Sequence, residues 1–329
     1  MKDLWASLKT LHACYAPWIS LALGVLTRVL SHRGVDFAPK AVAILALAWL
    51  LPLAITRWLH APPQGTREPR FHCFVRTVSP TVTVLLYKNV LFFLVPIWFG
   101  SSHVDSINVL VPVLLGAMAV FSCFAQRYRE LVLDNPRVRV LWTAVILFAA
   151  LVPATAVVAF TSPRTSIIIS ALVASVVAWL ALAPTENLLA WRGLLSMVRL
   201  SLLATAVLGL AAPLFPPVPF VCHDHGIGTM LVNRELVGRA QHFPSGTHKV
   251  FAWFEVTLPR RDRQPIAFQW YRDGGPVGPP VRTSVEGGRK NGYRTATSRL
   301  MPAVGSWRVD LVTGQSSQLI GRSTFVVDP

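Results

Sequence analysis

Residues 194–215 read LLSMVRLSLLATAVLGLAAPLF, and residues 216–225 continue as PPVPFVCHDH. The first segment is almost entirely apolar, and a helix of about 22 residues extends about 33 Å, which is enough to cross the core of a bilayer. Proline fixes φ and lacks an amide donor, so the Pro-rich residues that follow end the helix and favour an extended, semi-rigid spacer. The stretch therefore predicts a last membrane span joined to a different kind of domain.

The composition is typical of an integral membrane protein. Of the 329 residues, 53% are hydrophobic and only 14% are charged, whereas soluble domains carry about 25% charged residues. The formal charge of +16 comes largely from Lys and Arg in the loops between apolar runs. Loops on the cytoplasmic side of a membrane are enriched in these residues, so the charge does not indicate a nucleic-acid partner.

Seven apolar runs are long enough to be membrane spans. They cover residues 13–30, 41–58, 80–99, 107–124, 140–160, 166–183 and 194–215. No cleavage site of small residues follows the first run, so it is interpreted as an uncleaved anchor and not as a signal peptide. The predicted domains are a transmembrane helical domain over residues 1–215, a Pro-rich linker over 216–222 and a soluble β-domain over 223–329.

Loop charge predicts the orientation of these spans. With the N-terminus in the cytoplasm, eleven positive side chains lie inside, namely Lys2, Lys9, Arg57, Arg67, Arg70, Arg76, Arg127, Arg129, Arg137, Arg139 and Arg192. Only Arg33, Lys40 and Arg164 then lie outside. Seven spans place the C-terminal domain on the outer side, which is the periplasm for a bacterial inner membrane.

Lys88 and Asn89 lie near the middle of the third predicted span. An ionisable residue at that depth is costly and is a candidate functional group. The alternative is that Lys88 extends its long side chain to the cytoplasmic surface while Asn89 bonds to a neighbouring helix. The seven apolar runs contain no Asp or Glu, which disfavours proton-coupled transport.

After the spacer, the hydrophobic period changes from 3.6 residues to two, which is typical of strands. The predicted strands cover residues 230–238, 250–258, 266–270, 280–285, 293–300, 307–311 and 325–327. Turn sequences such as Asp273-Gly274 separate them. Seven short strands in about 100 residues predict an immunoglobulin-like β-sandwich, with Trp270 and Trp307 in its core.

Three segments of this region carry a resemblance to a known family. They are Phe268-Gln269-Trp270-Tyr271 with Asp273-Gly274, then residues 293–298 (YRTATS), then residues 305–310 (GSWRVD) with a closing Phe325-Val326-Val327. Over residues 250–327 the chain resembles the bacterial domain-of-unknown-function family 2914. Tyr293 and Ala296 stand where members of that family have tryptophans. The resemblance implies a sandwich domain carried by bacterial membrane proteins, and it implies no activity.

Cys222, His223 and His225 form a candidate metal site, because all three are residue types that bind zinc. An extended segment would place His223 and His225 on one side and Cys222 on the other. Neither a second C-x-x-C pair nor an H-x-x-x-H pair completes a tetrahedral set, so the alternative is a polar linker near the membrane. No cofactor is expected.

A second candidate site is a contact surface formed by Phe251 and Trp253 with Arg260, Arg261 and Arg263. The two aromatic residues alternate with the core positions of their strand, where polar residues normally face water. This face is covered by other parts of the protein or the membrane, pairs with a second copy, or stacks on a ligand. From Phe220 onward the chain has fourteen Lys or Arg and eight Asp or Glu, a balance of 14 − 8 = +6. The surface is therefore suited to membrane lipids with anionic head groups, to a glycan or to an acidic protein partner.

The sequence contains neither a G-x-S-x-G element nor a phosphate-binding G-x-x-x-x-G-K loop, so an enzyme is not expected. The predicted function is a noncatalytic membrane protein that presents a β-sandwich outside the membrane for ligand or partner binding, in envelope sensing or assembly. The alternative is a transport or lipid-handling protein in which the helices act and the sandwich is accessory.

Overall fold

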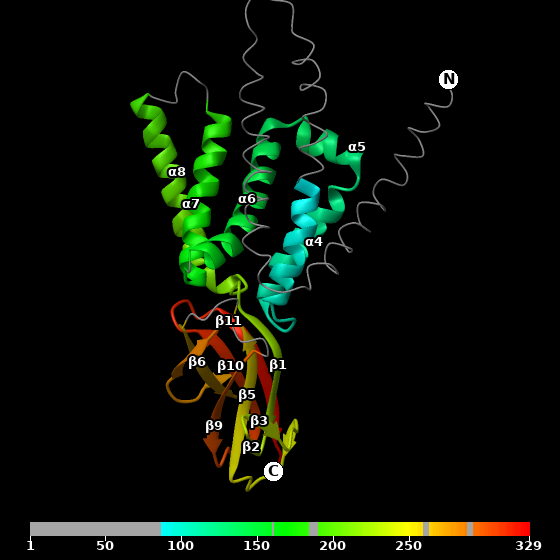
Figure 1. Cartoon of the computed structure of the whole chain (residues 1–329), viewed down its shortest axis with the longest axis vertical. Helices are drawn as coiled ribbons and strands as arrows, with labels where there is room; N and C mark the ends of the chain where they lie inside the picture. Colours follow the sequence, from blue (N-terminus) through cyan, green and yellow to red (C-terminus); the bar gives the residue numbers. More distant parts are fainter. Residues whose placement is uncertain (1–86, 160, 184–189, 259–262, 288–291) are drawn as a thin grey trace, which may run out of the picture. The chain divides into compact units, whose positions relative to one another are not determined.

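A computed structural model describes residues 87–159, 161–183, 190–258, 263–287 and 292–329 of the chain. A helical region precedes a region built of strands (Figure 1). The first two predicted spans and the beginning of the third lie outside the described residues.

Among the described residues, three helices are long and apolar enough to cross a membrane. They are α6 (Pro136–Val158), α7 (Pro163–Leu182) and α8 (Trp191–Leu210), and they coincide with the last three predicted spans. A fourth span results if the bent pair Ile107–Phe121 and Gln126–Leu133 counts as one. This pair contains η2 (Ile107–Val109), α4 (Leu110–Phe121), α5 (Ala125–Tyr128) and η3 (Arg129–Leu133). A shorter apolar helix covers Tyr87–Gly100.

The last helix ends earlier than predicted. The apolar run continues to Phe215, but α8 stops at Leu210 and a short 3₁₀-helix, η5 (Ala212–Leu214), follows. Pro213 lies inside η5, and a proline cannot donate the amide hydrogen bond that would continue the α-helix. Hydrophobicity alone therefore overestimates the length of this helix.

The chain divides into two compact units. Among the described residues, the first unit contains residues 87–96, 114–154 and 173–200. Side chains link its helices: the rings of Tyr128 and Trp142 meet edge to face at 5.4 Å, and Trp179 Nε1 donates to Ser196 Oγ at 3.0 Å. The second unit contains residues 97–113, 155–172 and 201–329, and so includes all the described strands.

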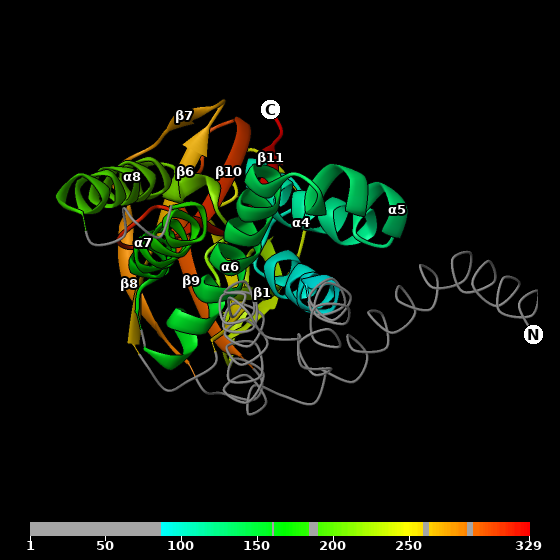
Figure 2. The same cartoon turned by 90° about the horizontal axis from the view of Figure 1, so that it is seen from above.

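The strands form two main sheets and one hairpin, and Figure 2 shows β6, β10 and β11 of the larger sheet side by side. The three-stranded sheet has the order β1 (Val221–Gly228), β5 (Lys249–Thr257), β9 (Tyr293–Leu300). The six-stranded sheet has the order β4 (His242–Phe243), β11 (Leu319–Val327), β10 (Gly305–Thr313), β6 (Arg263–Arg272), β7 (Gly275–Pro276), and β8 (Val281–Glu286) also pairs with β6. The strands β2 (Met230–Val232) and β3 (Glu235–Val237) form the hairpin.

Alternating side chains from both main sheets form one hydrophobic core. Trp270 and Trp307 belong to it with exposed fractions of 3% and 2%, as predicted. The rings of Trp307 and Phe325 stack with centroids 5.9 Å apart. We call residues 221–329, which contain both sheets and the hairpin, the β-domain.

Two segments of the β-domain differ from the prediction. Residues 230–238, predicted as one strand, form the β2–β3 hairpin, because Asn233 and Arg234 both adopt positive φ (50° and 66°) and make a two-residue turn. Residues 221–222, assigned to the linker, begin β1.

The Pro-rich spacer is a compact, buried turn and not an extended tether. Pro216, Pro217 and Val218 are buried, and the amide of Phe220 donates to Pro217 O at 2.8 Å. Gln318 Nε2 in turn donates to Phe215 O at 3.1 Å. The spacer is therefore fixed by burial and by a hydrogen-bond donor from the β-domain.

Residues 101–108, which join the helix Tyr87–Gly100 to α4, also contact the β-domain. Asn108 Nδ2 donates to Leu319 O at 3.4 Å, and Arg322 Nη1 donates to Asp105 O at 2.9 Å. Asn108 is 1% exposed. The β-domain is therefore held to its neighbouring helix ends by several contacts, and not only by the chain connection.

Candidate functional site

The β2–β3 hairpin lies on the outer face of the three-stranded sheet, where its turn contacts Trp253. Trp253 is 4% exposed, and its Nε1 donates to Arg234 O in the hairpin turn at 2.8 Å. Gly226 and Gly228 allow the close approach: a Cβ on Gly228 would lie 2.7 Å from Val237 O. The hairpin therefore covers Trp253, which the alternating pattern of its strand predicts to face water.

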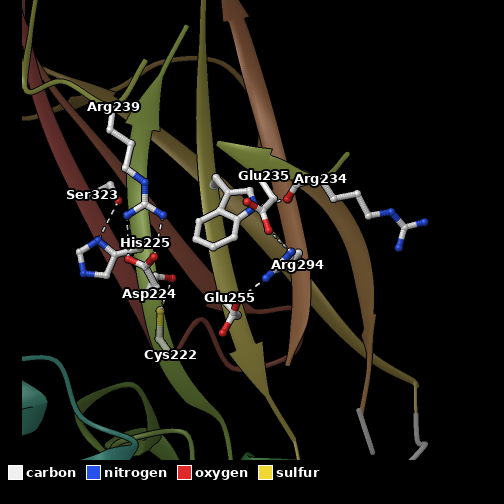
Figure 3. A network of polar contacts seen from close by, with 10 residues as sticks. Cys222, Asp224, His225, Arg234, Glu235, Arg239, Glu255, Arg294 and Ser323 are labelled. Atoms are coloured by element: carbon white, nitrogen blue, oxygen red, sulfur yellow. Dashed lines mark hydrogen bonds and ion pairs between the residues drawn. The ribbon is translucent and has the colours of Figure 1, made fainter. Parts of the chain in front are cut away.

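Two arginines hold this face together (Figure 3). Arg239 donates to both oxygens of Asp224, at 3.0 and 2.6 Å, and its guanidinium lies 5.1 Å from the centre of the Trp253 ring. Arg294 donates to Glu255 at 3.1 Å and to Glu235 at 2.8 Å. The hydrogen bonds from Arg239 lower the pKa of Asp224 below its usual value. Each of these guanidinium groups already has carboxylate partners.

The structure places the described residues of the predicted contact surface in different surroundings. Trp253 is buried by the chain's own hairpin, and so cannot stack on a ligand or insert into a membrane. Phe251 is half-buried, with Lys249 Nζ 4.7 Å from its ring centre. Arg263 is exposed at the start of β6, while Arg260 and Arg261 lie outside the described residues. Of the three alternatives for this face, the structure favours the one in which another part of the protein covers it. The β2–β3 hairpin is the part that covers Trp253.

The structure does not bring Cys222, His223 and His225 together as a metal site. A β-bulge in β1 makes His223 an extra, exposed residue between the pairs Cys222–Val256 and Asp224–Glu255. Burial raises the pKa of the Cys222 thiol to about 12, which disfavours the thiolate that metals bind. Across the described parts of the chain, no group of three or more His, Cys, Asp or Glu could hold a metal ion.

His225 instead pairs with a histidine that the sequence analysis did not single out. Its ring lies 5.5 Å from that of His103, which comes from the loop after the helix Tyr87–Gly100. His225 Nδ1 also lies 3.0 Å from Ser323 Oγ, and its ring stacks on Phe254 at 6.0 Å. Burial lowers the pKa of both histidines, and each positive charge would disfavour the other. No sequence pattern connects residues 103 and 225.

A second polar group lies on the outer face of the six-stranded sheet. It contains Tyr271 on β6, Arg308 and Asp310 on β10, and Arg322 on β11, and we call it the polar row. Arg322 donates to both oxygens of Asp310, at 2.7 and 3.0 Å. The guanidinium carbon of Arg308 lies 4.0 Å from the centre of the Tyr271 ring. The signal was present in the sequence, because Arg308 and Asp310 alternate with core residues Trp307 and Val309.

Comparison with known families identifies the chain. The family of unknown function DUF5924 matches residues 1–244, which is more than half of the chain. The chain belongs to family DUF5924. The family of unknown function DUF2914 matches residues 263–327 of this DUF5924 protein and confirms the resemblance noted in the sequence. No curated protein matches the chain.

The two family matches meet inside a single core of this DUF5924 protein. Phe220, Ile227 and Phe243 come from the first match and pack with Trp270 and Trp307 from the second. The hairpin belongs to the DUF5924 segment, whereas the polar row belongs entirely to the DUF2914 segment. The polar row therefore lies entirely in the part of the β-domain that matches DUF2914.

Lys88 and Asn89 lie in the helix Tyr87–Gly100 and face different surroundings. Lys88 is 8% exposed, while Asn89 is exposed. A lysine that extends along a helix to reach water keeps its ammonium group accessible. Burial of Lys88 therefore does not favour the interpretation in which it extends to the membrane surface.

Proposed function

We propose that this DUF5924 protein is a noncatalytic component of the bacterial inner membrane. It holds its β-domain at the periplasmic surface of that membrane to bind a ligand or partner. The attachment of the β-domain to the helix ends supports this most. The spacer is buried, and Arg322 and Asn108 connect β11 to the loop that precedes α4. A domain held in this way keeps one orientation relative to the spacer and this loop, as a receptor or assembly module requires.

The proposal includes seven spans, a cytoplasmic N-terminus and a periplasmic β-domain of the immunoglobulin-like class. The excess of Lys and Arg in the loops assigned to the cytoplasm supports the orientation. The two sheets around one core support the class. The role in envelope sensing or assembly is proposed from the predicted location of the β-domain.

A pair of reporter fusions tests the orientation. A reporter that is active only after export should be active when fused after Pro329. The same reporter fused after Asn135, in the loop before α6, should be inactive because that loop is assigned to the cytoplasm. Activity of a cytosol-only reporter after Pro329 would refute the proposed location.

Lys88 supports a second candidate function, in transport or lipid handling. A buried lysine in an apolar helix is costly to maintain and commonly marks a polar pathway or a bound anion. We expect Lys88→Met to leave the fold intact, since methionine keeps much of the side-chain length without the charge. If cells that depend on the protein tolerate this substitution fully, the helices have no role that needs the charge and the second candidate fails.

A further inference from the structure

Arg308 lies on the outer face of the six-stranded sheet and is held in place on two sides. Its guanidinium packs over the Tyr271 ring at 4.0 Å, and its Nε lies 3.4 Å from Asp310 Oδ2. The Asp310 side chain is 7% exposed and is fixed by two hydrogen bonds from Arg322. The Arg308 side chain keeps 34% exposure, so its position is defined while part of it remains accessible.

The hydrogen-bonding capacity of Arg308 is not used within the described structure. Its Nε is buried without a hydrogen-bond partner, since the contact with Asp310 is an ion pair that lacks hydrogen-bond geometry. None of the described residues accepts a hydrogen bond from its two terminal nitrogens. A buried polar group without a partner is uncommon in folded proteins and requires an explanation, such as a bound ion or water.

The charges of the polar row do not balance. Asp310 is the single carboxylate of the row and already accepts both hydrogen bonds from Arg322. Two arginines and one aspartate leave 2 − 1 = +1 within the row itself, while the charge of Asp105 acts on Arg322 from the neighbouring loop. Stacking on Tyr271 accounts for the orientation of Arg308, but it accepts none of its N–H groups. The cation–π contact with Tyr271 therefore does not explain why the N–H groups of Arg308 have no acceptor.

We propose that Arg308 binds an oxyanion, a phosphate or carboxylate group, on the outer face of the six-stranded sheet. The planar guanidinium can donate two parallel hydrogen bonds to such a group, and Tyr271 and Asp310 hold its plane in advance. This inference rests on the proposed function, because it gives the chemical class of the ligand that the β-domain binds.

The position of the site suggests two sources for the oxyanion. Arg322 contacts Asp105, in the loop that joins two apolar helices, and Arg308 lies two residues along β10 from Asp310. Two residues of a strand extend about 7 Å, which is the distance along β10 between Arg308 and the residue paired with Arg322, and this makes a lipid head group one candidate source. A soluble anion would meet the same guanidinium. Both the lipid head group and the soluble anion would offer an oxyanion to Arg308. The experiment below distinguishes these two sources.

The test uses the full chain, purified in a zwitterionic detergent at low ionic strength, where charge interactions are least screened. Inorganic phosphate is titrated by calorimetry against the wild type and against Arg308→Gln, Arg308→Lys and Arg282→Gln. Arg282 is the matched control, since it is an exposed arginine on β8 of the same sheet. A parallel arm compares thermal midpoints in nanodiscs with and without phosphatidylglycerol, to distinguish a lipid phosphate from free phosphate.

We expect Arg308→Gln to weaken phosphate binding about tenfold or more, because charge-assisted hydrogen bonds are lost. Arg308→Lys should also weaken it, since lysine keeps the charge but not the paired donors, and this variant keeps the test valid if the glutamine variant misfolds. Arg282→Gln should bind within about twofold of the wild type because it removes only a distant charge. A phosphatidylglycerol-dependent stabilisation lost in Arg308→Gln would identify lipid as the source.

The site is refuted if the wild type shows no saturable phosphate binding, if Arg282→Gln weakens binding as much as Arg308→Gln, or if Arg308→Lys binds like the wild type. Such a result would leave the reporter fusions unchanged, so the location of the β-domain would stand without this ligand. Phosphate binding together with a cytosolic C-terminus would have the opposite meaning: the site is real and the proposed location is wrong.

Discussion

The two main sheets of the β-domain both carry arginines on the face turned away from the core, but the arginines have different partners. On the three-stranded sheet, Arg239 and Arg294 share three carboxylates, those of Asp224, Glu235 and Glu255. On the six-stranded sheet, the polar row has one carboxylate for Arg308 and Arg322. The first face is closed by the chain's own hairpin, and the second retains unused donors.

This difference shows why aromatic and basic content alone does not locate a binding surface. The face that looked most suited to a ligand, with Phe251 and Trp253, is the one where Trp253 is covered and Arg239 and Arg294 already have carboxylate partners. The face with the unsatisfied group carries the less conspicuous Tyr271 and Arg308. A binding site is better predicted by what remains unpaired after folding.

The largest expected effect is on the core that both sheets share. Trp307→Ala removes a side chain that stacks on Phe325 and donates from Nε1 to Ala303 O at 2.8 Å. We expect a loss of about 3–5 kcal/mol in unfolding free energy, from lost burial and the cavity left behind. Amide hydrogen exchange in β10 and β11 of the full chain would measure it. Thr324→Ala, exposed on the neighbouring strand, is the control and should cost no more than about 0.5 kcal/mol.

A smaller effect should separate the two faces. Gly228→Ala places a methyl group 2.7 Å from Val237 O and 2.8 Å from Leu236, so the hairpin must move away from β1. Overpacking of this kind typically costs about 1–3 kcal/mol. Trypsin should then cleave faster after Arg234 in the hairpin turn, while phosphate binding at Arg308 should not change. Gly275→Ala is the control, because its new methyl group would meet Arg272 O at an ordinary 3.6 Å.

The sequence predicted most of the strands because their local patterns are strong. Residues 293–300 form β9 as predicted, and residues 250–258 form β5 with a shift of one residue, since both alternate clearly and end at turn sequences. The strand β1 was missed because the bulge at His223 interrupts the alternation and Gly226 and Gly228 are weak strand formers. The hairpin turn was missed because Arg234 replaces the usual glycine.

The candidate sites were harder to predict for a different reason. Alternation alone places Arg308 and Asp310 on one face, but the pairing of Asp310 with Arg322 depends on the register between β10 and β11. The cover over Trp253 and the approach of His103 to His225 are tertiary contacts between segments far apart in the chain. Such contacts leave no local pattern in a single sequence.

The histidine pair predicts a pH dependence of the β-domain's attachment. Because the pKa values of His103 and His225 are lowered in the folded chain, the unfolded chain binds protons more readily. Their contribution to stability is therefore complete above a pH of about 6.5 and is lost as the pH falls below it. Nearby charges on Asp105, Asp224, Arg239 and Arg322 modify the shifts without reversing them. The melting midpoint should fall on acidification from pH 7 to pH 5.

The double variant with His103→Gln and His225→Gln removes both titrating rings and should show a flatter midpoint over the same range. His223→Gln is the matched control, since His223 is the exposed bulge residue of the same strand. A double variant with the same acid sensitivity as the wild type would show that other groups cause the pH dependence.

The smallest effect is expected at the closed face and is the most direct check on the difference between the faces. Asp224 and Arg239 each keep 46% side-chain exposure, and exposed ion pairs contribute about 0–1 kcal/mol, so Arg239→Gln should lower stability by no more than that. The lowered pKa of Asp224 means that the pair's contribution is present above a pH of about 4 and is lost as the pH falls below it. The variant should therefore be less acid-sensitive than the wild type below pH 4. It should also bind phosphate as the wild type does, because the Arg239 guanidinium is already occupied by Asp224. If Arg239→Gln reduced phosphate binding as much as Arg308→Gln, arginines with and without unused hydrogen-bond donors would be equivalent, and the distinction between the two faces would not hold.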